Sequence, residues 1–197
     1  MTSIYTIEKG LPIEDGNVKE KAGVIGYSLL ELAALNIPVT PGFIIDISDI
    51  LDQPKETIQN LLQEGISKLE QSTGRKLADS SSPLLLDAAL SPSMIMEKTP
   101  SISYIGLNSQ IVSSLHASVQ QDSVYFSFLN LLESYSKVCL GKEVEKTAST
   151  DPKSECEKLS EALGDQFPLN PFNQLESAVM AMAKEYHADP MNKDIPA

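Results

Sequence analysis

The spacing of apolar residues changes along the chain, and this change is the feature that most restricts the fold. Up to residue 107, short apolar runs such as "GFII" and "PLLLDAAL" alternate with helical patterns, of which "PKETIQNLLQEGISKLEQS" (54–72) is the most regular. From residue 108 onward, apolar residues recur at the three- and four-residue intervals of amphipathic helices. The sequence therefore predicts an α+β fold, with an α/β lobe over 1–107 and a three-helix subdomain over 108–197.

The charge balance restricts the partners. The chain has 27 acidic and 15 basic residues, a formal net charge of −12, and among the basic residues Arg75 is the single arginine. Nucleic-acid and anionic-membrane surfaces need clustered cations, so we expect neither kind of partner. Bidentate recognition of phosphate relies heavily on guanidinium groups, and this chain offers one such group.

The location of the protein is predicted from the absence of several signals. No apolar run approaches the roughly 18 residues of a membrane span. The N-terminal "MTSIYTIEKG" does not have the basic and apolar regions of a secretory signal. Cys139 and Cys156 do not form a Cys-x-x-Cys pair or a disulfide framework. We expect a cytoplasmic protein.

Residues that could hold a metal or act as catalysts are scattered. Asp46, Asp49 and Asp52 follow one another at three-residue intervals and could collect a cation, but solvated carboxylates at a turn are the favoured interpretation. His116 and His187 are far apart in the sequence and indicate no Ser/His/Asp arrangement. We predict no metal site and no catalytic residue from these patterns.

The stretch "KEKAGVIGYSLLEL" (19–32) places lysines and glycines before a predicted helix. Backbone N–H groups at a helix start can bind phosphate, so this loop is a candidate phosphate cradle. It matches neither G-x-x-x-x-G-K-[ST] nor G-x-G-x-x-G, and from the spacing alone an ordinary connection from a loop to a helix is favoured.

Several segments, in order over nearly the whole chain, carry the motif residues of one enzyme family. "VIGYSLLEL" and "LNIPVTPGF" follow G-K-G-A-N-L-A-E-M and L-G-L-P-V-P-P-G-F, and "SPLLLDAALSPS" parallels N-P-L-L-V-S-V-R-S-G-A. "IGLN" parallels L-G-L-N, and "FPLNPFNQLESAVMAM" follows F-P-Q-D-P-x-x-Q-L-x-x-A-I-x-A-V. These segments resemble the N-terminal nucleotide-binding region of pyruvate phosphate dikinase and its relatives.

The resemblance implies a fold and a chemistry. In that family the region is part of an ATP-grasp unit, which passes a phosphoryl group from ATP to a histidine on a swivelling domain. A partial ATP-grasp lobe, with a small mixed sheet and flanking helices, is therefore expected here. In the family the second ATP-grasp lobe lies C-terminal to this region, so we expect these 197 residues alone not to be a competent kinase.

The family's cationic positions are not retained. The lysine of G-K-G falls on Ile25, the arginine of S-V-R-S-G falls on Ala89, and an Arg-Arg pair of a later helix falls on Leu129 and Asn130. Phosphoryl transfer needs such groups to neutralise the triphosphate. Apolar family positions are kept while cationic ones are replaced.

The leading hypothesis is a catalytically inactive protein, similar to the dikinase N-terminal region, that acts as a binding or regulatory module. It would need no cofactor. Its partner would be another protein or a second copy of the chain. The contact would use exposed apolar surface or the loop with Met94 and Met96, which stands roughly where the family has Met-Pro-Gly-Met-Met-Asp.

The alternative is the ATP-binding component of a split pyruvate phosphate dikinase or phosphoenolpyruvate synthase. The second lobe and the histidine domain would then be on another chain, and ATP and Mg would be cofactors. Lys21, Gly23, Gly26 and Ser28 would be the remaining contacts on the phosphate side. A third possibility is a module for another small molecule, and a cleft without cations would favour neutral or apolar ligands.

Overall fold

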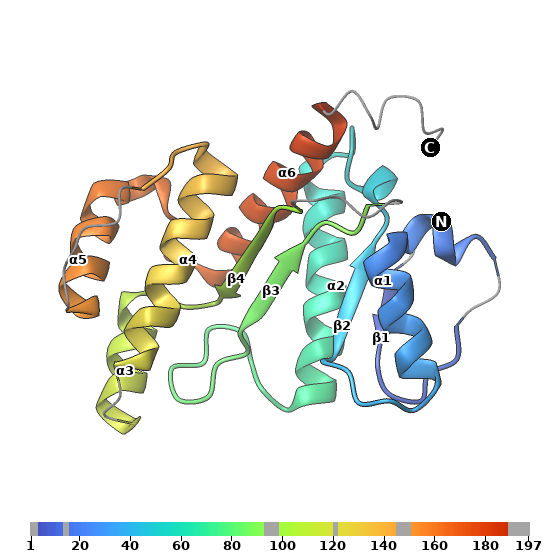
Figure 1. The fold of residues 1–197 in the computed structure, drawn as a ribbon, viewed down its shortest axis with the longest axis horizontal. Helices are drawn as coiled ribbons and strands as arrows, with labels where there is room; N and C mark the ends of the chain where they lie inside the picture. The colour runs from blue at the N-terminus through green and yellow to red at the C-terminus, as the bar shows by residue number, and fades with distance from the viewer. Residues whose placement is uncertain (1–3, 14–15, 93–98, 120–121, 145–150, 189–197) are drawn as a thin grey trace. The chain divides into compact units, whose positions relative to one another are not determined.

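The fold is described from a computed structural model that covers residues 4–13, 16–92, 99–119, 122–144 and 151–188 (Figure 1). The chain divides into two compact units built from interleaved segments. The first unit comprises 1–74, 90–99 and 183–197, and the second comprises 75–89 and 100–182. The boundary that the sequence predicts, after residue 107, lies inside the second unit.

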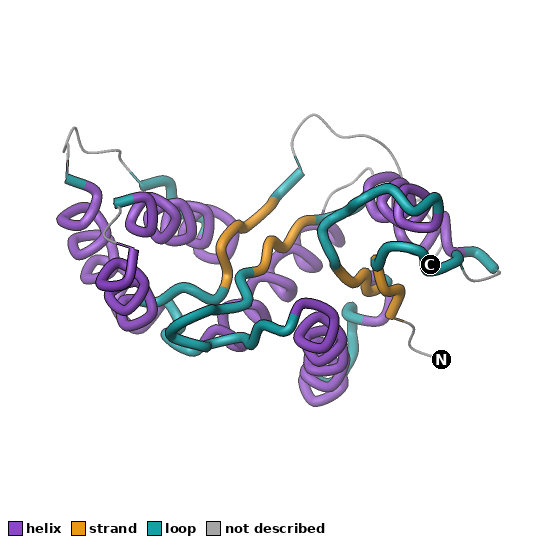
Figure 2. The backbone as a smooth tube through the Cα atoms, turned by 90° about the horizontal axis from the view of Figure 1, so that it is seen from below, coloured by secondary structure: helices purple, strands orange, loops and turns teal. Residues whose placement is uncertain are grey.

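The first unit contains a two-stranded antiparallel sheet and two helices. Strand β1 (Ile4–Ile7) pairs with β2 (Gly42–Ile45), and the helices α1 (Val18–Ala34) and α2 (Lys55–Thr73) each contact both strands. A short 3₁₀ helix, η1 (Ile47–Asp49), follows β2. Each of the two strands has four residues, whereas α1 has 17 and α2 has 19; in Figure 2 strands are orange and helices purple. A cluster of buried apolar side chains forms the core around α1: Ile7, Val18, Ala22, Leu30 and Ala33.

Helix α2 forms where its pattern predicts. Pro54 is its N-cap, and Gly74 ends it in the left-handed conformation with φ 68°. Its buried side chains lie on one face: Ile58, Leu61, Leu62, Ile66 and Leu69. Gly65 lies on this face because the ring of Phe43 from β2 packs against it, and a Cβ at Gly65 would lie 2.6 Å from that ring.

The second unit contains the other sheet and the remaining helices. Strand β3 (Leu86–Ala89) pairs antiparallel with β4 (Ser101–Ile105), with an irregularity between Leu86 and Ala88. Helix α4 (Ser123–Leu140) packs on β4, and it also contacts α3 (Ser109–Val119) and α5 (Pro152–Leu163). The 3₁₀ helix η2 (Gly164–Gln166) precedes α6 (Pro171–Ala188), which belongs to this unit as far as Met182.

A buried glutamine fastens the start of α6 to the residues that follow β4. Gln174 is 0% exposed. Its amide nitrogen donates to the carbonyl oxygens of Leu107 and Pro168, at 2.9 Å each, and its Oε1 accepts from the Gly106 N–H at 2.9 Å. All of its side-chain polar atoms are therefore satisfied, which is what a buried amide requires.

The predicted α+β class is confirmed, and two details differ from the expectation. The described strands form two separate antiparallel pairs, not one mixed sheet. Four helices, not three, lie between residues 109 and 188 in the described part of the chain. Strand β1 is not predicted by the sequence, because four residues give too short an apolar pattern. Among the described residues no helix has the length and apolar character needed to cross a membrane.

Candidate functional site

Helix α1 is interrupted at Gly23, in the stretch that the sequence marks as a candidate phosphate cradle. Gly23 has φ 66° and ψ 179°, which are not helical values. The helical turns that follow therefore begin afresh at Val24. The first amide groups of such a helix segment point out without intrahelical acceptors, and this is where an anion could bind.

Residues from the segment after β3 occupy these amide groups. The Gly26 N–H donates to the Ser91 hydroxyl oxygen at 2.8 Å, and the Val24 N–H donates to the Pro92 carbonyl oxygen at 2.9 Å. The Ser91 hydroxyl in turn donates to the carbonyl oxygen of Ala22 at 2.6 Å. We call these three hydrogen bonds the Ser91 cap. The chain's own atoms thus provide the acceptors that a phosphate would provide at this helix start.

The glycines of the stretch are explained by this close packing. A Cβ at Gly23 would lie 1.8 Å from the Ser91 carbonyl oxygen and 2.6 Å from its hydroxyl oxygen. A Cβ at Gly26 would lie 2.8 Å from Cδ1 of Ile44 in β2. Only residues without a side chain allow the 90–92 segment and β2 to approach α1 so closely.

The predicted residues Lys21, Ile25 and Ser28 lie on α1 beside the cap. The Lys21 ammonium group lies 3.6 Å from the Asp46 carboxylate, so its charge is paired. Ser28 is exposed, and Ile25 is 46% exposed. An apolar side chain therefore faces solvent at the position where the resemblance has a lysine.

The other predicted positions belong to the second unit or lie outside the described residues. Ala89, at the end of β3 opposite Ser101, is exposed and is not part of a core. On α4, Leu129 is half-buried and Asn130 is exposed. The structure brings together the predicted residues of α1, while these three positions are assigned to the other unit. Met94 and Met96 lie outside the described residues.

Sequence reasoning missed Ser91. The register that puts the arginine of S-V-R-S-G on Ala89 also puts the glycine of that motif on Ser91. Ser91 therefore adds a hydroxymethyl group where the motif has a glycine, and this difference can be seen in the sequence. What it touches could not be read, because Ser91 and Gly26 are 65 residues apart.

A metal centre finds no support among the described residues. Asp46 accepts the Ser48 N–H at 3.1 Å and caps η1, which accounts for its buried position. No group of three or more His, Cys, Asp or Glu side chains that could hold a metal ion occurs in the part of the chain that the structure describes.

Comparison with known proteins agrees with the motifs. No family profile matches the chain. It is 28% identical to pyruvate, phosphate dikinase 1, chloroplastic, of Arabidopsis thaliana, and the match covers 96% of this chain and 23% of that protein. It is 26% identical to pyruvate, phosphate dikinase of Rhizobium meliloti (strain 1021), over 91% of this chain and 23% of that protein. The chain thus spans about a quarter of the length of these relatives, and the resemblance seen in the motifs is confirmed.

Proposed function

Because the chain is related to pyruvate phosphate dikinase over nearly its whole length, we propose that it is a catalytically inactive form of the corresponding nucleotide-binding segment. Its role is that of a cytoplasmic binding or regulatory module that works without ATP or Mg. The observation that carries this proposal is the Ser91 cap, which occupies the Val24 and Gly26 N–H groups, just after the interruption of α1 at Gly23, with acceptors from the chain itself.

Charge supports the same function. A bound triphosphate must be surrounded by cations and N–H donors, and loss of one such donor costs about 3–4 kcal/mol of transition-state stabilisation. In this chain, the positions where the dikinase family has cationic side chains are occupied by uncharged residues: Ile25, Ala89, Leu129 and Asn130. Lys21, the cation next to Gly23, already pairs with Asp46.

Titration calorimetry with Mg-ATP tests the proposal. We expect no binding heat up to about millimolar nucleotide, and saturable binding with one site per chain would instead favour the ATP-binding component of a split enzyme. The variant Ile25→Lys restores the family's lysine, and Ser28→Lys adds the same charge at another exposed position of α1. Because the amides remain capped in both variants, neither should gain binding. Binding by Ile25→Lys alone would show that the missing lysine, not the cap, is what prevents it.

The partner surface that we propose is an apolar patch at the C-terminal end of α1. The Gly10 N–H donates to the Ala33 carbonyl oxygen, and the Ile37 N–H donates to that of Leu32, so the flanking loops lie against the helix. Four large apolar side chains are exposed there: Leu11, Leu32, Leu35 and Ile37. We call these four residues the α1 patch.

The occupant of the α1 patch is a different protein that presents a small apolar element with basic flanks. Four exposed side chains amount to a few hundred Å², which is less than the ~800 Å² per partner of a standard interface. The net charge of −12 also disfavours a second copy and favours a basic partner.

A designed amphipathic peptide of leucine and lysine serves as the probe. We expect saturable binding that Leu35→Gln weakens at least fivefold. Leu169→Gln, which removes a similarly exposed leucine (66%, against 71% for Leu35) from the second unit, should leave it unchanged. Equal binding by both variants contradicts the assignment, as does a dimer in sedimentation equilibrium that Leu35→Gln dissociates, because the occupant would then be a second copy.

A further inference from the structure

The Ser91 hydroxyl bonds to two groups of α1 that would bond to each other in an uninterrupted helix. In an α-helix each N–H donates to the carbonyl oxygen four residues earlier, so the Gly26 N–H would donate to Ala22. Here the Gly26 N–H donates to the Ser91 hydroxyl oxygen at 2.8 Å, and the same hydroxyl donates to the Ala22 carbonyl oxygen at 2.6 Å. A side chain inserted in this way between a helical donor and its acceptor is a recurrent cause of a kink.

The neighbouring amide is treated in the same way. The Val24 N–H donates to the Pro92 carbonyl oxygen at 2.9 Å, whereas in an uninterrupted helix it would donate to that of Glu20. Gly23, just before Val24, has φ 66° and ψ 179°, but a glycine can also adopt helical values. The backbone of α1 can therefore satisfy both N–H groups itself, without the 90–92 segment.

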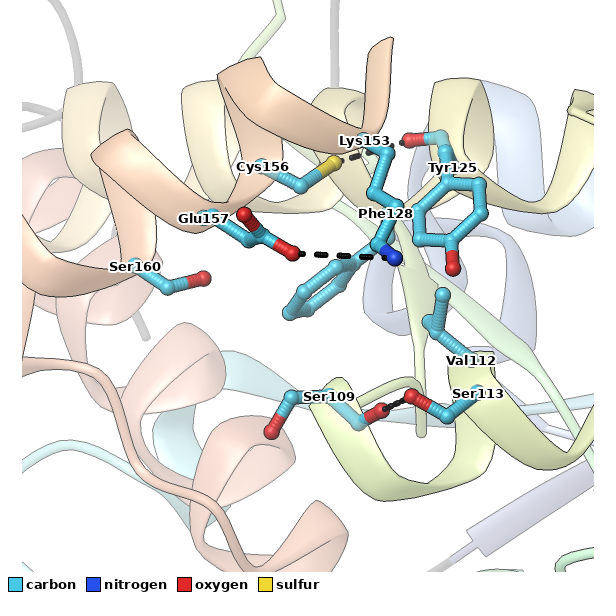
Figure 3. Close-up of a pocket in the computed structure, with 9 residues that line it drawn as sticks. All are labelled: Ser109, Val112, Ser113, Tyr125, Phe128, Lys153, Cys156, Glu157 and Ser160. Atoms are coloured by element: carbon cyan, nitrogen blue, oxygen red, sulfur yellow. Dashed lines mark hydrogen bonds and ion pairs between the residues drawn. The ribbon is translucent and has the colours of Figure 1, made fainter.

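Other side chains bond to helix carbonyls without interrupting the helix. The Cys156 thiol donates to the Tyr125 carbonyl oxygen at 3.1 Å, and the Ser113 hydroxyl donates to that of Ser109 at 2.8 Å (Figure 3). Helix α4 continues through Tyr125, and α3 continues past Ser113. Ser91 differs because its hydroxyl donates to a carbonyl and also accepts from the N–H that would pair with that carbonyl.

The interrupted and the continuous arrangement of α1 exclude each other. If the Gly26 N–H bonds directly to Ala22, the Ser91 hydroxyl loses both of its partners. The fit at Gly23 is also close, because a Cβ there would lie 1.8 Å from the Ser91 carbonyl oxygen. A rotation of the Gly23 backbone therefore requires the 90–92 segment to leave its place, as in other packed elements with two discrete arrangements.

Opposing contacts set the balance between the two arrangements. Val18 and Ala22, on the turns before Gly23, are 3% and 1% exposed, and Pro92 is buried. This burial favours the interrupted helix with the 90–92 segment docked. The direct hydrogen bonds of an uninterrupted α1 favour the continuous helix.

We propose that α1 is a two-state element and that the 90–92 segment is its switch: α1 is interrupted while the segment is docked and becomes one continuous helix when the segment leaves. A partner that binds the released segment would drive this change, because a ligand shifts an equilibrium toward the state that it binds more tightly. The inference does not depend on the proposed function, because it concerns hydrogen bonds within the chain and involves neither a nucleotide nor the α1 patch.

Scalar couplings across hydrogen bonds, measured in a long-range HNCO spectrum, test the proposal. In the wild type we expect no coupling between the Gly26 amide nitrogen and the Ala22 carbonyl carbon, and its presence would contradict the inserted hydroxyl. Ser91→Ala removes that hydroxyl, so the coupling should appear and the Gly23 Cα signal should shift to its helical value. Ser28→Ala is the matched control, because it removes an exposed hydroxyl of α1 and should leave the wild-type spectrum of Gly23 and Gly26.

A second variant reaches the same state from the other side of the contact. Gly23→Ala puts a methyl group where the docked segment leaves no room, while alanine favours a helix, so we expect a folded protein with the coupling between Gly26 and Ala22. Gly74→Ala, outside α1, is its control. The proposal is overturned if Ser91→Ala or Gly23→Ala folds without this coupling, if either control shows it, or if both variants unfold, because the interrupted helix would then be the only folded arrangement.

Discussion

At the scale of single residues, Gly23 determines whether α1 can carry the Ser91 cap. Its φ of 66° lies in the left-handed region, and its Cα faces the Ser91 backbone. Gly74 also has a left-handed φ, of 68°, but has nothing within 4 Å of a Cβ. Alanine substitutions at these two glycines therefore distinguish the free-energy cost of the left-handed conformation from the cost of a clash with Ser91.

We expect Gly23→Ala to lower the free energy of unfolding by about 3 kcal/mol or more, because backbone strain adds to a clash with the Ser91 carbonyl oxygen. Gly74→Ala should cost about 1 kcal/mol, which is the strain alone. Urea unfolding followed by circular dichroism measures both. Equal losses of unfolding free energy for the two variants would mean that a side chain at position 23 does not clash with the 90–92 segment.

At the scale of elements, the start of α6 depends on Gln174. Gln174→Met keeps the length of the side chain and removes its polar atoms, leaving the Gly106 N–H and the carbonyl oxygens of Leu107 and Pro168 without their partner. Each such buried group costs about 1–3 kcal/mol, so we expect a loss of at least ~3 kcal/mol in urea unfolding. Asn173→Met, at the exposed neighbouring position, should stay within about 0.5 kcal/mol of the wild type.

Helices α4 and α5 each carry one cysteine, Cys139 and Cys156. Desolvation by burial is the main cause that raises the pKa of Cys139 and of Cys156, each to about 12. At pH 8 the folded protein should therefore hold almost no thiolate, and its reaction with a disulfide reagent should be much slower than that of the unfolded chain. The folded-state rate should keep rising about tenfold per pH unit beyond pH 9, so a plateau near pH 9 would contradict burial of these thiols.

Which elements could be predicted follows from how local their causes are. At the start of α3, the Asn108 side chain accepts the Ile111 N–H at 2.9 Å, and at the end of α4, Gly141 has φ 64°. Both boundaries are therefore determined by residues that are close to them in the sequence. The register of β1 with β2 and the Ser91 cap join residues that are distant in the sequence. Side-chain type alone does not specify such pairs. The exposure of Ala89 likewise depends on the folded structure and not on its neighbours in the sequence.

At the scale of the whole molecule, the proposed loss of nucleotide binding agrees with the charge of the chain. A net charge of −12 with one arginine disfavours the approach of a polyphosphate, and the chain matches about a quarter of the length of a dikinase. Under the proposed function, no phosphate binds at the Val24 and Gly26 N–H groups of α1, because Ser91 and Pro92 already occupy them.

The most direct measurement is the amide chemical shifts of Val24 and Gly26 during a titration with Mg-ATP to about 5 mM. Their N–H groups already donate to Pro92 and Ser91, so we expect both signals to stay in place. Sodium chloride at the same ionic strength serves as the control for general ionic effects. A saturable shift of these two amides with Mg-ATP, and not with sodium chloride, would contradict the proposed loss of nucleotide binding and show that these amides still accept a nucleotide.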